Sequence, residues 1–409
     1  MKNIAVVGAG IVGICSAYFL KKSGFNVTLI DREDPGTMTS FGHACSFADY
    51  ANVPVNYPGL IWDIPKMLLR KDGPLAVDFF YILKNLPWAF SFLQNCKKEK
   101  VDEIASSLTN LLKHSQLSYD EIFKDINVQE YISHEENLYL FDTKKSFEDY
   151  EYANVIRKNN KVKVRNLTKD EVKELEPNIA NVYYAGQIFT GSRHTTNPLA
   201  ISTKIFEKFL ELGGTYIKQN VKNLIQKENF IELSLDNKKI IFDKIIISAG
   251  AWSNQIANML GDKFPLDTER GYHILFETNE KLINRPVAWS ESGFYLIQIH
   301  DGIRAAGTVE IAGLKKSPNS MVFFEKSTPT IRILLLVSFA IRKKPDLSLS
   351  TFFLVPSGDI AIMKPLYFRV TSLISLFNAS GFTLLTGIPP IFFRSLWKPF
   401  LKIECLPIQ

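Results

Sequence analysis

The sequence has little of what disulfide-stabilised and metal-binding proteins depend on. Only four cysteines occur in 409 residues, and no two of them form a CxxC pair. The six histidines show no HxH or HxxxH spacing. A chain of this length buries enough apolar surface to fold without disulfides. The sequence therefore predicts no metal site and a reducing compartment.

Long hydrophobic runs are absent from the N-terminus. Residues 1–3 lead directly into Ile4-Ala5-Val6-Val7, and glycines follow at once. A secretory signal has a longer apolar stretch and a small-residue cleavage site, and a membrane-spanning helix needs about 20 apolar residues. We therefore expect a cytoplasmic protein.

Excess charge is also absent over most of the chain. Residues 317–409 contain 10 Lys and Arg against 4 Asp and Glu, which accounts for the whole net charge of +6. Residues 1–316 are balanced, so the composition argues against nucleic acid as a partner, since nucleic-acid-binding domains are basic. With 46% apolar and 22% charged residues, the chain has a globular composition.

What is present begins with a dinucleotide-binding pattern. A short apolar stretch typical of a buried strand, residues 3–7, precedes the turn Gly8-Ala9-Gly10-Ile11-Val12-Gly13. A helical pattern that stops near Gly24 and a second strand, residues 26–30, follow, and Asp31 ends the unit. The order strand, glycine turn, helix, strand and acid is that of a Rossmann unit.

Each residue of this pattern has a physical role. Gly8 permits the tight turn, Gly10 lets the backbone approach a pyrophosphate, and Gly13 lets the helix pack on the strands. The free N–H groups at the helix N-terminus attract phosphate. Asp31 is placed to accept hydrogen bonds from ribose hydroxyls, and its charge disfavours the 2′-phosphate of NADP. The pattern alone leaves FAD and NAD open.

The next segment carries a family resemblance. The stretch Thr39-Ser40-Phe41-Gly42-His43-Ala44-Cys45 resembles the second flavin-contact segment of the D-amino acid oxidase-like superfamily, and in particular of bacterial D-amino acid dehydrogenases. His43 stands where that group has Asn, and Cys45 where it has Gly. Residues 58–76, 245–253 and 265–273 resemble further segments of the group, so that the likeness covers residues 1–316.

The resemblance implies an α/β fold, with an FAD-binding Rossmann-like domain and an interleaved α+β substrate domain. The FAD-binding domain comprises residues 1–50 and 191–260. The substrate domain comprises residues 51–190 and its sheet, residues 261–316. Residues 317–409 form an atypical tail.

The resemblance also implies site residues. Ala249 and Gly250 are small because a side chain at the end of this strand would clash with a cofactor. The implied FAD-binding residues are Gly8, Ala9, Gly10, Ile11, Val12, Gly13, Asp31, Arg32, Ser40, Ala44, Val221, Ala249, Gly250 and Trp252. Tyr272 and Arg304, on alternating strand patterns, are the candidates for facing the substrate.

The implied activity is oxidative deamination of D-amino acids to 2-oxo acids and ammonia, with hydride transfer from Cα to flavin N5. Electrons then pass to a quinone, as in dehydrogenases, or to O2, as in oxidases. A glycine or sarcosine type amine oxidase is one alternative. A flavin-binding but inactive chain is a second, and an NAD-dependent dehydrogenase is a third that a bound yellow chromophore would exclude.

Residues 55–100 are rich in aromatic and apolar side chains with lysine and arginine interspersed. One interpretation is a set of helices packed on the core. The other is a peripheral contact with the inner face of a membrane, where a quinone could accept electrons.

The tail departs from the family pattern. The resembling proteins have an Arg-Pro-Ser motif whose arginine pairs with the substrate carboxylate, but here the sequence is Val355-Pro356-Ser357. Their glycine-rich HxGxTL-like stretch corresponds at best to residues 379–384, without histidine. Residues 370–393 carry no charge, yet they contain glycines and prolines that argue against a membrane-spanning helix. A frameshift near residue 317 is the hypothesis that accounts for these departures.

Overall fold

A computed structural model describes residues 1–69, 75–317, 352–354, 360–362 and 403–408. The tail motifs around Val355 and residues 379–384 lie outside the described residues, as does most of the segment to which the frameshift hypothesis applies. Within the described part, no helix is both long and apolar enough to cross a membrane.

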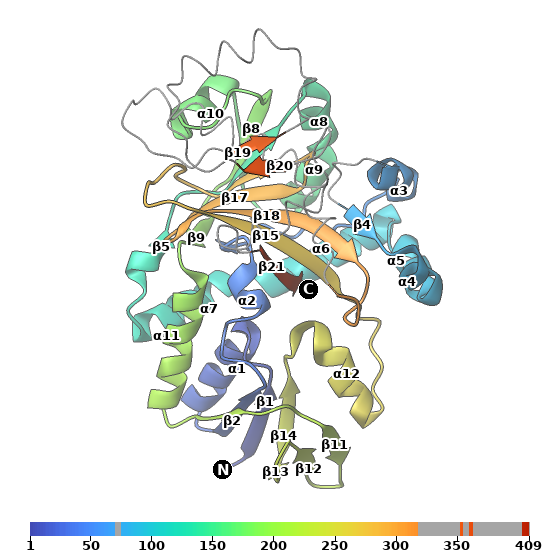
Figure 1. Ribbon diagram of the computed structural model, residues 1–409, viewed down its shortest axis with the longest axis vertical. Helices are drawn as coiled ribbons and strands as arrows, with labels where there is room; N and C mark the ends of the chain where they lie inside the picture. The colour runs from blue at the N-terminus through green and yellow to red at the C-terminus, as the bar shows by residue number, and fades with distance from the viewer. Residues whose placement is uncertain (70–74, 318–351, 355–359, 363–402, 409) are drawn as a thin grey trace.

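A four-stranded parallel sheet forms the lower part of the molecule in Figure 1. Its order is β10-β2-β1-β14. The strands are β1 (Asn3–Val7), β2 (Asn26–Asp31), β10 (Thr215–Lys218) and β14 (Lys244–Ile247). All four run in the same direction, so the residues that follow them meet at one edge of the sheet.

Both faces of this sheet are covered, which explains why its strands are almost continuously apolar. Helices α1 (Ile11–Lys22) and α11 (Pro198–Glu211) pack on one face, where Val6 and Leu29 join Ile14 and Ile205 in one core. The other face packs on a small antiparallel sheet, which consists of β11 (Asn223–Gln226), β12 (Ile231–Ser234) and β13 (Lys239–Phe242). Strands β12 and β13 form an antiparallel hairpin within it.

A nine-stranded mixed sheet lies above the parallel sheet in Figure 1. Its order is β21-β15-β18-β17-β16-β6-β8-β7, and β4 pairs beside β18. The strands are β4 (Leu75–Val77), β6 (Leu138–Phe141), β7 (Val164–Leu167), β8 (Ala185–Phe189), β15 (Glu269–Glu277), β16 (Val287–Trp289), β17 (Phe294–Ile299), β18 (Gly302–Ile311) and β21 (Ile403–Ile408).

The remaining elements link or cover these sheets. A three-stranded sheet, β3 (Ser46–Phe47), β9 (Arg193–Thr195) and β5 (Ile132–Ser133), connects the two large ones. The other helices are α2 (Thr39–Gly42), α3 (Leu60–Leu69), α4 (Phe79–Lys84), α5 (Leu86–Gln94), α6 (Lys98–Leu112), α7 (Ser115–Asp125), α8 (Lys144–Asp149), α9 (Glu151–Asn159), α10 (Lys169–Leu175) and α12 (Ser253–Ala257). A two-stranded pair, β19 (Phe352–Leu354) and β20 (Ile360–Ile362), completes the strands.

Strand pairing divides the side chains of the nine-stranded sheet between two faces. Arg304 is opposite Leu275 on β15 and Ile297 on β17, and Ala306 is opposite Tyr295. Directly paired residues point to the same side. We call the side that bears Arg304 the cavity face. The opposite face holds a large apolar core that includes Leu138, Val287, Trp289, Leu296 and Ile303.

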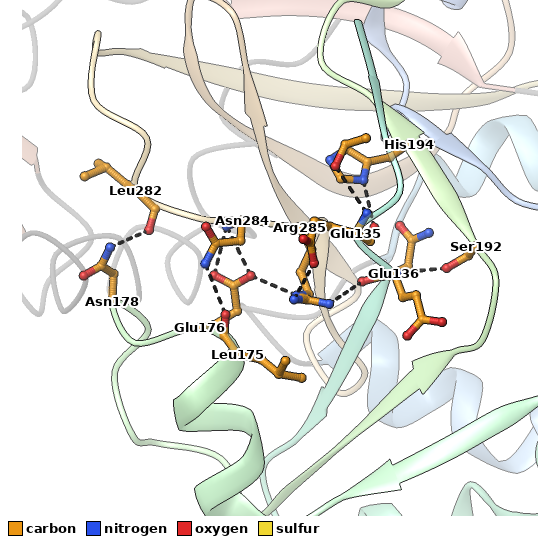
Figure 2. A network of polar contacts seen from close by, with 12 residues as sticks. Glu135, Glu136, Leu175, Glu176, Asn178, Ser192, His194, Leu282, Asn284 and Arg285 are labelled. Atoms are coloured by element: carbon orange, nitrogen blue, oxygen red, sulfur yellow. Dashed lines mark hydrogen bonds and ion pairs between the residues drawn. The ribbon is translucent and has the colours of Figure 1, made fainter. Parts of the chain in front are cut away.

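A buried polar network fastens the loops at the far end of this sheet (Figure 2). Arg285 donates from Nε to Glu176 at 3.1 Å and from Nη2 to Glu135 at 2.7 Å. The Glu176 carboxylate also accepts the backbone N–H of Asn284 at both oxygens. Burial raises the pKa of Glu176 to about 7, and its hydrogen bonds oppose that rise.

Residues 3–31, 215–218 and 244–247 supply the parallel sheet, while residues 75–77, 138–189 and 269–311 supply most of the nine-stranded one. The chain therefore crosses between the two sheets more than once, which is the arrangement that an interleaved pair of domains requires. The domain boundaries at residues 50, 190, 260 and 316 stay a prediction.

Candidate active site

The turn after β1 contains two glycines that packing within the protein requires and a third that leaves space for a ligand. Gly8 has φ 107°, and a Cβ there would lie 2.3 Å from the carbonyl oxygen of Ser248. A Cβ on Gly13 would lie 1.8 Å from the Gly8 oxygen. At Gly10 a Cβ would meet only the Ser40 Oγ, at 3.2 Å. Gly8 and Gly13 are thus required by packing, whereas Gly10 leaves open the space that a pyrophosphate needs.

The N-terminus of α1 is prepared for an anion. Ile14 is the residue whose N–H bonds to Gly10 O, so the amides before it lie outside the helical ladder. The amide of Ile11 donates to Ser40 Oγ at 2.8 Å. The first turn carries no acidic residue. The positive end of the helix dipole is therefore not neutralised by a carboxylate of the helix itself.

Asp31 and its neighbours form the other end of this binding edge. The Asp31 carboxylate accepts the Ala9 N–H at 2.6 Å and the Glu33 N–H at 3.0 Å, and the remaining lone pairs suit ribose hydroxyls. The guanidinium of Arg32 lies 4.6 Å from the centre of a Trp252 ring. These residues lie along the carboxyl ends of β1, β2 and β14, where doubly wound sheets bind dinucleotides.

The remaining predicted cofactor residues flank this edge. Val221 is buried in the core beneath β2. Ala249 precedes a 3-10 turn, Gly250–Trp252, in which Gly250 has φ 56°. Ala44 lies in the segment that follows α2. The donors and open space of the edge as a whole fit an FAD.

Arg304 anchors the segment Phe41–Cys45 to the nine-stranded sheet. Its side chain is 1% exposed, and Nη1 donates to the carbonyl oxygens of Phe41 at 2.6 Å and His43 at 3.3 Å. The guanidinium lies 4.7 Å from the centre of the Phe41 ring. Arg304 also reaches the Cys45 sulfur at 3.9 Å. The segment that resembles a flavin contact is thus held from the cavity face.

Cys45 adopts an unusual backbone conformation in this segment. Its φ of 58° lies in the left-handed region, which costs a residue other than glycine roughly 1–2 kcal/mol. The Cys45 N–H donates to His43 Nδ1 at 2.8 Å. Burial raises the pKa of the Cys45 thiol to about 11, and burial together with Arg304 lowers the pKa of His43 to about 4. Both side chains are therefore neutral at neutral pH.

Two cavities open on the cavity face, beside the segment Phe41–Cys45. The first, which we call the charged cavity, has a volume of about 510 Å³. It is lined by Phe41, His273, Leu275, Glu277, Thr278, Asn279, His300, Asp301 and Arg304. The second, which we call the tyrosine cavity, has a volume of about 370 Å³ and lies next to Ala44, Cys45 and Ser46.

The tyrosine cavity is apolar apart from a set of hydroxyl groups and the imidazole of His43. Tyr139 and Tyr295 form a hydroxyl–hydroxyl hydrogen bond, and Tyr50 forms another with Ser46 at 3.3 Å. Burial raises the pKa of Tyr295 to about 12 and those of Tyr50 and Tyr139 further. Among the described residues that line the cavity there is no Asp, Glu, Lys or Arg. Its phenols therefore stay protonated and serve as neutral donors.

The structure does not bring the two predicted substrate-facing residues together. Arg304 lines the charged cavity, but Tyr272 lies on the opposite face of β15. The Tyr272 hydroxyl donates to Glu310 at 2.6 Å, and Arg270 donates to the same carboxylate oxygen at 2.7 Å. Glu310 is buried, so Tyr272, Arg270 and Glu310 form an internal polar cluster that stabilises the fold.

Sequence reasoning missed the residues of the tyrosine cavity. Tyr295 lies in a stretch expected to be a strand, but its face could be assigned only once its pairing with Ala306 was known. Tyr139 reaches the same face through β16, because Ala288 is opposite both Tyr139 and Tyr295. Tyr50 follows the resembling segment directly and was the one member that proximity in the sequence could have suggested.

Helices α3, α4 and α5, at the right of Figure 1, carry exposed apolar side chains. Trp62 is 78% exposed and Phe80 is 75% exposed. The exposed apolar surface comprises Ile61, Trp62, Leu68, Leu69, Phe79, Phe80, Leu83, Leu86 and Phe90. On their inner side these helices are fastened by Tyr81, which donates to Asp267, and by Asp78, which pairs with Lys316. Exposed apolar clusters of this size mark contact surfaces.

Comparison with known proteins agrees with this geometry. The family model described as "FAD dependent oxidoreductase" (DAO) matches residues 3–335. Over 322 residues the chain is 30% identical to a D-amino-acid oxidase of Bradyrhizobium diazoefficiens, covering 78% of this chain and 76% of the relative. Over 316 residues it is 24% identical to a D-amino acid dehydrogenase of Vibrio vulnificus, covering 75% and 76%.

Solved structures show the same fold. Glycine oxidase from Geobacillus kaustophilus aligns with a TM-score of 0.60 at 13% identity, covering 83% of this chain and 80% of that one. L-proline dehydrogenase from P. horikoshii aligns with a TM-score of 0.59 at 18% identity, covering 83% and 78%. At these identities the likeness concerns the fold alone.

Proposed function

We propose that this chain, which belongs to the DAO family of FAD-dependent oxidoreductases, oxidises D-amino acids to 2-oxo acids and ammonia. The family's activity is FAD-dependent oxidation of amino acids, and the two relatives named above act on D-amino acids. The observation that carries the proposal is the tyrosine cavity, which opens beside Ala44 and Cys45 in the segment that resembles a flavin contact. We take this cavity as the substrate site.

The charge of the two cavities favours this choice. An amino acid loses hydride from Cα most readily when its amine is neutral, because the nitrogen lone pair assists the departure. In the charged cavity Glu277 and Asp301 would stabilise the protonated ammonium. The tyrosine cavity has no carboxylate among its described lining residues, and its apolar walls favour the neutral amine by desolvation.

The hydroxyl pairs provide the hydrogen-bond donors with which the tyrosine cavity binds a substrate carboxylate. In a bond between two hydroxyls one proton bridges the oxygens and the other stays available. The pairs Tyr139–Tyr295 and Ser46–Tyr50 therefore each retain one donor without an acceptor among the described residues. Two donors suit the two oxygens of a substrate carboxylate. The apolar lining, including Ile11 and Phe47, leaves room for a small apolar side chain.

When bound, FAD supplies the two-electron acceptor for this oxidation. The chain's own contribution is to hold the cofactor and the substrate and to keep water away. Ser40 and Asp31 fix the glycine turn, and Arg304 fixes the segment Phe41–Cys45. The neutral His43 and Cys45 add no charge beside the cavity at neutral pH.

The visible spectrum of the purified chain tests the proposal. We expect a bound yellow flavin that bleaches when D-alanine is added without oxygen, and that does not bleach with L-alanine. In the Tyr139→Phe/Tyr295→Phe double variant, which removes the free donor of this pair, the bleaching should be slower by roughly 10–100-fold in kcat/KM, the cost of one donor to a charged group. A flavin that D-alanine leaves unbleached would contradict the proposal and favour the inactive, flavin-binding alternative.

We further propose that electrons pass to a quinone in a membrane that the exposed apolar surface contacts. Aromatic side chains such as Trp62 and Phe80 suit the boundary between headgroups and acyl chains. The exposed Lys84 lies among them, and the carboxylate of Asp78 is already paired with Lys316. The surface thus combines apolar and basic character, which fits anionic lipid.

Co-sedimentation of the holoenzyme with anionic vesicles tests this contact. Wild-type protein should sediment with the vesicles, and a Phe79→Ser/Phe80→Ser double variant should remain largely in solution with its D-alanine activity toward a soluble dye intact. Wild-type protein that stays in the supernatant at low salt would contradict the membrane contact. Faster flavin reoxidation by O2 than by a soluble quinone would favour the oxidase instead.

A further inference from the structure

Five arginines of the described residues are buried, and their partners differ. They are Arg157, Arg193, Arg270, Arg285 and Arg304. Arg193, Arg270 and Arg285 form ion pairs with carboxylates. Arg304 donates to backbone carbonyls and lines the charged cavity. Arg157, on α9, has no carboxylate at ion-pair distance among the residues that the structure describes.

The surroundings of Arg157 hold its guanidinium in place without neutralising it. Its side chain is 4% exposed. Nη2 donates to the Tyr150 hydroxyl at 2.9 Å and Nη1 to Asn154 at 3.3 Å. The guanidinium lies 4.9 Å from the centre of the Tyr150 ring and 5.0 Å from that of Phe189. Nε is buried without a partner among the described residues.

These contacts place Arg157 directly behind the tyrosine cavity. Phe189, which lies against the guanidinium, stacks on Tyr50 with ring centres 4.1 Å apart. It also meets Tyr139 edge to face at 4.7 Å. Tyr50 and Tyr139 both line the cavity. Two aromatic rings, Phe189 and then Tyr50 or Tyr139, therefore separate the cation from the cavity, and no described carboxylate stands in between.

The charge of Arg157 is felt at the cavity hydroxyls. Burial raises the pKa of Tyr295 and of Tyr50, and Arg157 works against that rise at both. A buried cation without a counter-ion is unfavourable, and an anion in the adjacent space relieves the penalty. Because the effective dielectric constant of a protein interior is low, the Coulomb attraction between the guanidinium and an anion in the cavity extends across the intervening rings.

We infer that Arg157 is a positioning residue that supplies the positive charge for a carboxylate in the tyrosine cavity. It acts through Tyr150, Phe189 and the cavity phenols and does not touch the ligand. The inference rests on the proposed function, since it takes the tyrosine cavity as the site of the substrate carboxylate. It predicts that the cavity prefers an anionic carboxylate over a neutral amide of the same shape.

Binding of benzoate and of benzamide to the holoenzyme, followed by the change in flavin absorbance, tests the inference. Wild-type protein should bind benzoate more tightly than benzamide. Arg157→Met should weaken benzoate at least about tenfold, the scale of losing one nearby charge at a partly screened site, and leave benzamide nearly unchanged. Arg157→Lys should retain most of the preference because it keeps the charge.

Arg193→Met/Asp120→Asn is the matched control. Arg193 is also buried and lies over two rings, Phe47 and Phe123, but Asp120 neutralises it at 2.6 Å. Replacing both members of this neutral pair should leave the preference for benzoate within about twofold of the wild type, because the net charge near the cavity does not change. If Arg157→Met yields no holoenzyme, Arg157→Gln keeps an amide donor for Tyr150 and gives the same comparison.

The outcomes separate the two proposals. The role of Arg157 would be overturned if Arg157→Met binds benzoate and benzamide with the same affinity ratio as the wild type. That result includes the case in which both affinities fall by the same factor. Wild-type protein without a preference for benzoate would overturn it as well. The proposed function fails on a different result, a bound flavin that D-alanine does not reduce.

Discussion

Arg285 and Arg157 show two ways of burying the same side chain. Arg285 lies between the carboxylates of Glu176 and Glu135, which take up its charge within the loops of Figure 2. Arg157 lies between two rings and a phenol, which orient it and leave its charge in place. The first arrangement fixes loops to one another. The second creates a positive potential beside an empty space, which is useful only if an anion occupies that space.

Arg304 is an intermediate case. Its partners are the carbonyl oxygens of Phe41 and His43, which are dipoles and not charges. It therefore both positions a loop and keeps a positive charge on the cavity face. The three arginines suggest that the partner of a buried cation, more than its burial, indicates whether the cation serves stability or binding.

The largest expected effect is the loss of the fully paired arginine. Arg285→Leu leaves Glu176 buried without its cation, so at pH 8 and above, where Glu176 is ionised, we expect about 3–5 kcal/mol of lost unfolding free energy. Arg157→Met leaves no carboxylate behind and should cost only about 1–2 kcal/mol. Urea unfolding of both variants measures the difference. Equal losses would remove the distinction between the two arginines.

The pH dependence of the free energy of unfolding further tests the difference between Arg285, which pairs with Glu176, and Arg157, which has no described carboxylate partner. The pKa of Glu176 rises from 4.5 to about 7 on folding, so its contribution is complete below pH 4.5 and is lost as pH rises to 7. That contribution amounts to up to roughly 3 kcal/mol. Thermal melts of the wild type should therefore drop across this window relative to Glu176→Gln, which does not titrate. Parallel profiles of the two proteins would contradict the assignment.

Removal of Arg304 tests the intermediate case. Arg304→Met leaves the carbonyl oxygens of Phe41 and His43 without their donor, and we expect a loss of about 1–3 kcal/mol. Flavin should also dissociate more readily, because the segment Phe41–Cys45 is no longer held. Gel filtration followed by the ratio of flavin to protein absorbance would report the retained flavin. Full retention of flavin would show that the segment does not depend on this anchor.

The smallest expected effect concerns the left-handed backbone conformation of Cys45. Alanine is normally more stable than glycine by about 0.5–1 kcal/mol in regular structure. At φ 58° the order should invert, with Cys45→Gly more stable than Cys45→Ala by about 1 kcal/mol. Chemical denaturation of the two variants decides the order, and the usual order would show that the backbone at residue 45 is unstrained.

Much of the fold could be predicted because its signals are local. The apolar strand at residues 3–7, the glycine turn and the strand that ends at Asp31 are each set by a few adjacent residues, and all are confirmed as β1, α1 and β2. The predicted FAD cofactor and fold class are confirmed by the family match. A boundary such as the one between α6 and α7 is harder to predict, because no glycine or proline marks the break near His114.

The substrate side could not be predicted in the same way, because it depends on register between distant strands. The sequence shows which residues of β15 and of β18 alternate between two faces. It does not show which face of β15 lies on the same side of the sheet as a given face of β18. A bulge between Gly271 and Tyr272 adds to the difficulty. For this reason Tyr272 and Arg304 were grouped although they lie on opposite faces, and Tyr295 was overlooked although it shares the face of Arg304.

The bond from Arg304 to Phe41 has a consequence for the order of events in the cell. The two residues are separated by 263 positions in the chain. At about 5–20 residues per second, a ribosome needs roughly 13–50 s to pass from one to the other. Throughout that interval the glycine turn has been synthesised, but the segment Phe41–Cys45 lacks the side chain that anchors it. We therefore expect stable capture of the cofactor to be a late step of biosynthesis, which waits for a strand made long after the nucleotide-binding turn.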